Sequence, residues 1–117
     1  MKKILLLMVL FAFSIQAEAQ TKKNKNAKYT VGVSGNCEMC KKRIEKAAFL
    51  VKGVKSAVWH ADCQDIHLVL DENKCTVEEV QKAIAAVGHD TDFAKADDAV
   101  YEKIHTCCQY ERKLLKK

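Results

Sequence analysis

The sequence contains no proline, and it lacks the residue arrangements on which hydrolytic enzymes depend. No serine–histidine–aspartate constellation, paired-carboxylate site or glycine-rich phosphate loop stands out among its 117 residues. The missing proline also argues against a thioredoxin-like fold, in which a proline faces the pair of redox cysteines. We therefore expect that the chain is not an enzyme.

The N-terminal residues have the pattern of a secretory signal peptide. Residues 1–3 are a basic start, residues 4–15 are apolar, and Ala-Glu-Ala at residues 17–19 fits the small-x-small cleavage pattern. A retained membrane anchor is the alternative, but the apolar run is too short to span a bilayer comfortably. We therefore predict cleavage after Ala19, export to the periplasm, and no stable membrane insertion afterwards.

The chain carries a net charge of +5, and much of the basic excess lies in lysines near its two ends. Residues 20–28 are polar and rich in lysine and asparagine, so we expect a flexible leader there. Charge runs of this kind usually only keep a protein soluble. We interpret both ends as solvated tails.

All the cysteines follow the predicted cleavage site, and their even number in an exported chain suggests a disulfide framework. Their spacing is uneven, however, with a C-x-x-C pair, two isolated residues and an adjacent pair: Cys37, Cys40, Cys63, Cys75, Cys107 and Cys108. This spacing indicates one soft-ligand site with extra thiols rather than a small domain stapled by disulfides.

The C-x-x-C pair lies where a β-type run, residues 29–33, gives way to a helical pattern that starts at Cys40. One thiol in a loop and another in the first helical turn can both point at a single ion. The helix N-terminus and the basic residues 41–43 favour thiolate, the form that binds metal or attacks disulfides. Cys37 and Cys40 are therefore candidate metal ligands, with a redox pair and a structural disulfide as the alternatives.

Hydrophobic periods of two and of 3.6 residues predict six elements in all, including the two that flank the C-x-x-C pair. We expect four strands and two helices, at residues 29–33, 54–61, 66–70 and 90–94 and at residues 40–51 and 77–87 respectively. Thr76 and Glu79 form a capping box for the second helix. The order βαββαβ with right-handed crossovers predicts an α+β, ferredoxin-like fold, in which two helices cover one face of a four-stranded antiparallel sheet.

This topology predicts which cysteines lie near the C-x-x-C pair. The turn after the second strand and the turn after the second helix open at the same end of the sheet as the C-x-x-C loop. We therefore expect Cys63 and His89 at that pole, and Cys75 at the opposite one.

A third helix, at residues 96–106, leads to the adjacent cysteine pair. A helix of that length rises about 15 Å, enough to bring Cys107 and Cys108 back toward the C-x-x-C pole. Three roles remain open for these two residues: additional metal ligands, disulfide partners of other cysteines, or unreactive thiols.

Five segments, which together cover roughly residues 29–94, carry a family resemblance. They are Gly-Asn-Cys-x-x-Cys at 35–40, Ile-Glu-Lys-Ala at 44–47, Gly-Val at 53–54, Val-Leu-Asp at 69–71 and Val-x-x-x-Ile-x-x-x-Gly-His at 80–89. Together they resemble the heavy-metal-associated domain of copper chaperones, periplasmic mercury-binding proteins and metal-exporting ATPases. The resemblance implies that Cys37 and Cys40 are metal ligands. It also implies that the partner is a metal-transporting membrane protein or another thiol-bearing acceptor.

The sequence departs from that family in three places. The loop at residues 35–37 is one residue shorter than usual and lacks the family's buried methionine. His89 stands where the family often has tyrosine or lysine, and an imidazole there could be a third ligand or a pH-sensitive neighbour of the site. Cys107 and Cys108 lie outside the family's domain.

We divide the chain into a signal peptide (1–19), a flexible leader (20–28), a heavy-metal-associated domain (29–94) and a C-terminal helical extension (95–117). Two thiolates suit a soft cation, above all Cu(I), with Zn(II) or Hg(II) as alternatives. We expect a protein that binds such an ion and transfers or sequesters it. The competing hypothesis is thiol–disulfide exchange by the same pair.

RNA-recognition modules share this strand order, but they need aromatic side chains on the central strands to stack bases. The third predicted strand, residues 66–70, has no aromatic residue. We therefore expect no nucleic-acid partner.

Overall fold

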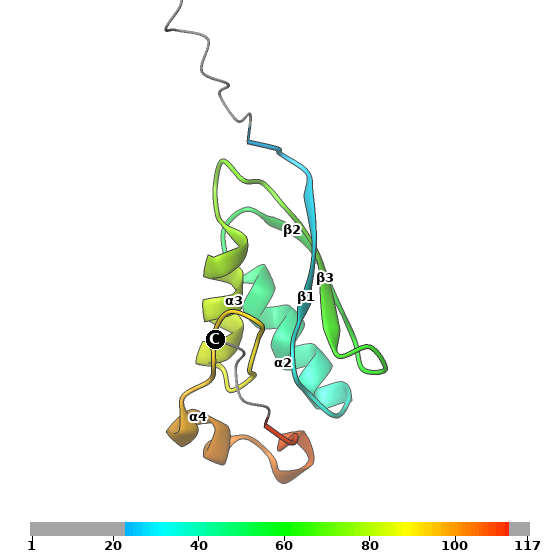
Figure 1. Ribbon diagram of the computed structural model, residues 1–117, viewed down its shortest axis with the longest axis vertical. Helices are drawn as coiled ribbons and strands as arrows, with labels where there is room; N and C mark the ends of the chain where they lie inside the picture. Colours follow the sequence, from blue (N-terminus) through cyan, green and yellow to red (C-terminus); the bar gives the residue numbers. More distant parts are fainter. Residues whose placement is uncertain (1–22, 113–117) are drawn as a thin grey trace, which may run out of the picture.

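The computed structural model describes residues 23–112, so the predicted signal peptide at residues 1–19 lies outside the described residues. In chain order the elements are β1 (Ala27–Gly32), α2 (Glu38–Phe49), β2 (Val54–His60), β3 (Asp65–Leu70), α3 (Val77–Ala86), α4 (Asp98–Lys103) and the 3₁₀ turn η2 (Thr106–Cys108), as Figure 1 shows. The order β-α-β-β-α confirms the predicted α+β class. No helix within residues 23–112 is long and apolar enough to cross a membrane.

The sheet is antiparallel and has β3 at its centre, in the order β1-β3-β2. Ala27 of β1 pairs with Leu70 on one side of β3, and Val54 of β2 pairs with the same residue on the other side. Helices α2 and α3 lie side by side against one face of this sheet (Figure 1). That arrangement is the ferredoxin-like layering that the sequence predicted.

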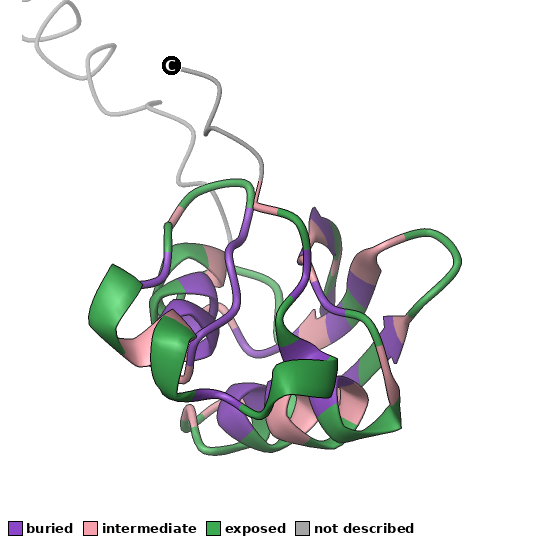
Figure 2. Ribbon diagram, turned by 90° about the horizontal axis from the view of Figure 1, so that it is seen from below, coloured by how far each residue is buried: buried purple, intermediate pink, exposed green. Residues whose placement is uncertain are grey.

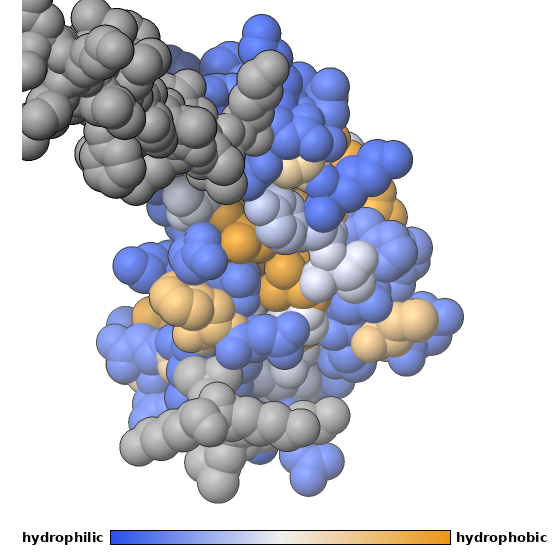
Figure 3. Space-filling model, turned by 45° about the horizontal axis from the view of Figure 1, so that its top comes forward, coloured by the Kyte–Doolittle hydropathy of each residue, from blue (hydrophilic) through white to orange (hydrophobic). Residues whose placement is uncertain are grey.

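The core lies between the sheet and the two helices. The alternating strand pattern buries one set of side chains, namely Val31, Ala57, Trp59, Ile66, Leu68 and Leu70. The 3.6-residue stripes of the helices supply the opposing set, namely Cys40, Ile44, Ala47, Ala48, Val80 and Ile84. Each fully buried isoleucine or leucine contributes about 1.5–3 kcal/mol to folding. Outside this layer, hydrophilic residues cover most of the face in Figure 3.

The prediction of a fourth strand at residues 90–94 is wrong, because the sheet in the described residues has three strands. This segment makes one isolated bridge, between Val33 and Thr91. The Thr91 N–H donates to the Ala94 carbonyl instead and closes a tight turn. The free N–H of Gly32 on β1 is satisfied by the carboxylate of Asp92, at 2.7 Å. Backbone pairing with the end of β1 is therefore limited to the Ser34–Asp90 and Asp92–Gly32 hydrogen bonds around that bridge, and it does not extend into a fourth strand.

Most other predicted boundaries differ by one or two residues, and two of these differences bear on the site. β1 begins at Ala27, inside the predicted flexible leader, because Ala27 is buried and pairs with Leu70. Helix α2 begins at Glu38 rather than at Cys40, with Cys37 as its N-cap in extended conformation. Both cysteines of the C-x-x-C pair therefore belong to the helix start.

The C-terminal extension is less helical than predicted. The expected helix at residues 96–106 is reduced to α4, which ends where Ile104 adopts an extended conformation. Ile104 packs against Gly88, which has a φ of +107°. From there the chain turns back through η2 and crosses the end of the domain, which Figure 1 shows at the bottom and Figure 2 views from below. This reversal brings Cys107 and Cys108 to the end of the domain at which α2 begins.

Candidate metal centre

The loop before the C-x-x-C pair is fixed by backbone bonds from two other turns. The N–H of Val33 donates to the Gln64 carbonyl and that of Ser34 to the Asp90 carbonyl, both at 2.9 Å. The Gly35 N–H donates to the side-chain oxygen of Gln64 at 3.0 Å. Gln64 reaches this position from a left-handed conformation with φ of 54°. The loop is therefore held by the turn after β2 and the turn after α3, as the topology predicted.

Trp59 fills the space beneath this loop. Its indole is 1% exposed, and its Nε1–H donates to the Val33 carbonyl at 2.9 Å. A side-chain carbon on Gly35 would lie 2.9 Å from the indole and 3.1 Å from Cβ of Cys40. Only glycine therefore fits at residue 35. The indole supports a loop that lacks the family's buried methionine.

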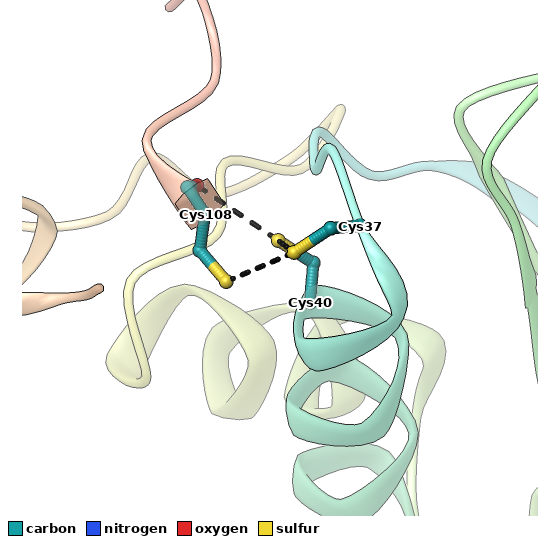
Figure 4. Close-up of side chains that lie close together, drawn as sticks. All are labelled: Cys37, Cys40 and Cys108. Atoms are coloured by element: carbon teal, nitrogen blue, oxygen red, sulfur yellow. Dashed lines mark hydrogen bonds between the residues drawn. The ribbon is translucent and has the colours of Figure 1, made fainter. Parts of the chain in front are cut away.

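Three sulfur atoms meet at the N-terminus of α2. Cys37 Sγ lies 3.5 Å from Cys40 Sγ and 3.3 Å from Cys108 Sγ, as Figure 4 shows. The three sulfurs all lie within 4.8 Å of one another. We call these three residues the inner sulfur group. Cys40 and Cys108 are buried and Cys37 is half-buried.

The geometry of the inner sulfur group fits a soft cation. Thiolates about 2.3 Å from an ion, at trigonal or tetrahedral angles, lie about 3.8–4.0 Å apart. The observed separations of 3.3 and 3.5 Å need only a few tenths of an ångström of expansion. All six cysteines are free thiols, so the sulfurs are available as ligands.

The environment of Cys37 favours its thiolate. Burial acts against ionisation, but the backbone N–H of Cys40 and hydrogen bonds with the thiols of Cys108, Cys40 and Cys107 outweigh it and lower the pKa of Cys37 to about 7. The N–H of Cys40 belongs to the helix N-terminus, so this part of the sequence argument agrees with the geometry. Burial raises the pKa of Cys108, as do its contacts with Cys40 and Cys37.

The basic residues after the pair have other partners than the sequence suggested. Lys41 Nζ lies 2.7 Å from the Glu45 carboxylate and donates to the Trp59 carbonyl at 3.1 Å. The charge of Arg43 acts on His89, whose pKa it helps to lower. Hydrogen bonds, rather than these cations, account for the low pKa of Cys37.

Tyr110 and Arg112 attach the extension to the domain. The Tyr110 hydroxyl donates to the Gly88 carbonyl at 2.8 Å and accepts from the Asp90 N–H at 2.7 Å. The Arg112 guanidinium makes a two-point contact with the Asp90 carboxylate, at 2.8 and 2.9 Å. These anchors lie just beyond Cys108, so they fix the third sulfur in place. Neither residue was predicted from the sequence, because nothing in their local pattern marks what they contact.

His89 lies at the predicted pole but is not a member of the inner sulfur group. It is fully buried, and its Nδ1 lies 2.8 Å from the Ser34 carbonyl, so Nδ1 carries the proton. Its ring stacks on Tyr110 with centroids 5.5 Å apart. His89 therefore supports the loop and the extension. Its Nε2 is buried without a hydrogen-bond partner, in keeping with a pKa that burial lowers.

The two isolated cysteines are not part of the cluster. Cys63 is exposed in the turn after β2, next to Gln64, and so lies at the predicted pole. Cys75 is buried at the start of α3, near Gly53 and Asp71. Of the four extra cysteines, the structure therefore brings only Cys107 and Cys108 to the C-x-x-C pair.

Comparison with known proteins identifies the domain. No family model matches the chain. Over 61 residues, however, it is 33% identical to the copper chaperone CopZ of Staphylococcus haemolyticus, a match that covers 51% of this chain and 90% of that protein. The chain belongs to the heavy-metal-associated domain family. A match of 61 residues is too short to include both Cys37 and Cys108, so the complete inner sulfur group has no counterpart in this alignment.

Solved heavy-metal-associated domains have the same fold. A CopZ metallochaperone aligns with a TM-score of 0.54 and 27% identity, over 56% of this chain and 98% of its own. A copper-binding domain of a P-type ATPase gives 0.53 and 29%, over 55% and 88%. Oxidised MerP from Ralstonia metallidurans gives 0.54 and 25%, over 56% and 93%. The matched proteins and domains are metallochaperones and metal-binding domains rather than catalytic domains, which agrees with the prediction that the chain is not an enzyme.

Proposed function

We propose that the protein binds a soft cation, above all Cu(I), through Cys37, Cys40 and Cys108, and passes it to a thiol-bearing acceptor or sequesters it. Zn(II) and Hg(II) suit the same ligands. The observation that carries the proposal is the approach of three sulfurs to within 4.8 Å of one another at a helix N-terminus. Membership of the heavy-metal-associated family supports it independently.

The third sulfur decides how tightly the ion is held. A site with two thiolates exchanges its ion readily, because an incoming thiolate can add to it directly. Cys108 occupies that third position, so an acceptor thiol must displace it. Cys37 and Cys40 alone would form a carrier site that releases its ion readily. With Cys108 as a third ligand, the site retains the ion until an acceptor thiolate displaces Cys108.

The exposed side of the site gives an acceptor its approach. A surface cavity of about 570 Å³ lies beside Cys37 and is lined by Asn36, Lys41, His60 and Asp62 among others. Cys40 and Cys108 are buried, so an incoming thiolate meets Cys37 first. A metal-transporting membrane protein with its own cysteine pair is the partner that this exchange suits best.

Competition for Cu(I) tests this function. The reduced protein is titrated without oxygen against a chelator of known Cu(I) affinity. We expect Cys37→Ser to abolish competition and Cys108→Ser to weaken binding about tenfold or more, which corresponds to at least 1.4 kcal/mol. Cys63→Ser is the matched control, since that thiol is exposed and outside the cluster. Copper retention that survives Cys37→Ser would contradict the proposal.

Thiol–disulfide exchange is the second candidate, and one observation favours it. Cys37 has a pKa of about 7, and a thiol whose pKa is near ambient pH attacks disulfides most efficiently. Cys40 and Cys108 could each resolve the mixed disulfide that results. A protein that binds no metal yet reduces insulin disulfides, with that activity lost in Cys37→Ser, would establish this function instead.

We also propose that the protein is exported, on the strength of the signal-peptide pattern at residues 1–19. Expression with its own N-terminus in a Gram-negative host tests this. We expect the periplasmic fraction to contain a chain whose mass is that of a protein that begins at Gln20. An uncleaved chain retained in the cytoplasm would contradict export.

A further inference from the structure

Three more soft donor atoms lie at the surface beside the inner sulfur group. Cys107 Sγ is 3.7 Å from Met39 Sδ and 3.3 Å from His105 Nδ1. Met39 comes from the first turn of α2, while His105 and Cys107 come from the reversal after α4. We call these three residues the outer donor group. A thioether, an imidazole and a thiol are all ligands that Cu(I) accepts.

Core packing does not explain why these side chains lie together. Met39 is 46% exposed, and His105 and Cys107 are exposed as well. Exposed side chains bury little apolar surface, so they gain little from contact with one another. What the three side chains share is a donor atom that soft cations accept, and the Cys107 sulfur lies near those of the other two.

The outer donor group is continuous with the inner one. Cys107 Sγ lies 3.7 Å from Cys37 Sγ and 3.9 Å from Cys108 Sγ. Two thiolates that bind the same ion are about 3.8–4.0 Å apart at trigonal or tetrahedral angles. The 3.7 Å spacing of the Cys107 and Cys37 sulfurs therefore matches that of two ligands of one ion. Cys37 Sγ contacts Cys40, Cys107 and Cys108, so it is the sulfur best placed to serve two ions.

We propose that Cys107, His105 and Met39 form a second soft-cation site, which shares the Cys37 thiolate with the first, so that one chain holds two Cu(I) ions side by side. This inference rests on the proposed function of the inner sulfur group. Each thiol releases its proton to solvent as it binds, and no electron is transferred. The ion in the outer site is the more accessible one, because all three of its own ligands are exposed.

The distribution of the excess negative charge favours two ions over one. Three thiolates around one Cu(I) leave an excess of two negative charges in a partly buried site, and uncompensated buried charge is costly. A second Cu(I) with the Cys107 thiolate leaves the excess unchanged but spreads it over two metal ions. A thiolate that bridges two cations is also better compensated than one bound to a single cation. The second ion therefore stabilises the cluster as a whole.

Counting ions by native mass spectrometry tests this inference. The reduced, full-length protein is loaded with Cu(I) in the presence of a competing chelator, so that weakly bound ions are removed. We expect two Cu(I) per chain in the wild type, and one in Cys107→Ser and in the double variant His105→Ala/Met39→Leu. Cys63→Ser, an exposed cysteine at the same pole, is the control and keeps two. X-ray absorption adds an independent readout, copper–copper scattering that disappears in Cys107→Ser.

The outcomes separate this inference from the proposed function. One Cu(I) in the wild type, lost in Cys37→Ser but unaffected by Cys107→Ser, overturns the second site and leaves the first intact. Two ions that persist in Cys107→Ser, or that occur only in a species of two chains, also overturn it. No bound copper in any variant overturns both. Cys37 is half-buried and the other substituted residues are exposed, so unchanged thermal unfolding will verify that each variant folds.

Discussion

Cys108 Sγ lies 3.3 Å from Cys37 Sγ, although 71 positions separate the two residues in the sequence. The C-terminal extension thus completes a cluster that begins in the family's own loop. Its completion depends on contacts beyond Cys108, chiefly those of Tyr110 and Arg112 with the turn after α3.

Arg112→Gln should release the extension from the domain. The substitution leaves the Asp90 carboxylate, which is 4% exposed, without its cation, at a cost of about 3 kcal/mol. Every 1.4 kcal/mol lost from the attachment raises the fraction of molecules with a detached extension about tenfold. Alkylation of the Cys108 thiol should therefore be at least about tenfold faster than in the wild type. Peptide mapping by mass spectrometry measures the rate. Lys103→Gln, at the exposed end of α4, is the control, and an equal effect in both variants would contradict the account.

Gly35→Ala should disturb the metal loop from beneath. The new methyl group would lie 2.9 Å from the Trp59 indole and 3.1 Å from Cβ of Cys40, and neither can move freely. We expect a loss of about 1–3 kcal/mol in unfolding free energy, measured with denaturant, together with weaker Cu(I) binding. The exposed neighbour Asn36→Ala should stay within about 0.5 kcal/mol of wild type. Wild-type stability and affinity in Gly35→Ala would show that the indole does not support the loop.

The alkylation of Cys37 should follow a titration centred near pH 7. Its pKa is lowered to about 7, so the thiolate forms as pH rises through that value. Cys63 is the internal comparison, because the carboxylates of Asp62 and Asp65 and some burial raise its pKa. Pulsed alkylation from pH 5 to 10 with peptide mapping reports both thiols in one sample. Identical profiles for the two cysteines would rule out the hydrogen-bonded thiolate.

Acid should destabilise the fold through His89. Burial lowers its pKa below the value of about 6.5 expected in the unfolded chain, so the unfolded state binds the proton first. Stability is therefore complete above about pH 6.5 and declines below it, by up to about 1.36 kcal/mol per pH unit for one proton. His89→Asn keeps an N–H donor for the Ser34 carbonyl but cannot be protonated. Denaturant unfolding at pH 7.5 and 5.5 should show a smaller drop in the variant, and equal drops would contradict this role.

Local sequence patterns predicted much of the fold. Strand alternation and helical stripes gave the β-α-β-β-α order, since burial of one face imposes those periods on the sequence. Thr76 is the N-cap of α3 as predicted, and its hydroxyl accepts the Glu79 N–H at 3.2 Å, which is one of the two bonds of the predicted capping box. Topology alone placed His89 at the C-x-x-C pole.

The features that were missed depend on contacts between distant segments. The β-type residues 90–94 make one isolated bridge rather than a strand, because the Thr91 N–H bonds to the Ala94 carbonyl within a turn. The return of Cys108 depends on Tyr110 and Arg112 finding Asp90 and Gly88. No local period encodes such pairs, so the sequence left the role of the extension open. Cleavage after Ala19 and export remain predictions.

The number of sulfur atoms bound to Cu(I) tests the central claim most directly. X-ray absorption on protein loaded with one equivalent of Cu(I) should show three sulfur neighbours per copper in the wild type and in Cys63→Ser. It should show two in the double variant Cys107→Ser/Cys108→Ser, which removes both thiols of the extension. Two sulfur neighbours in all three proteins would mean that the extension contributes no ligand, and would contradict the account.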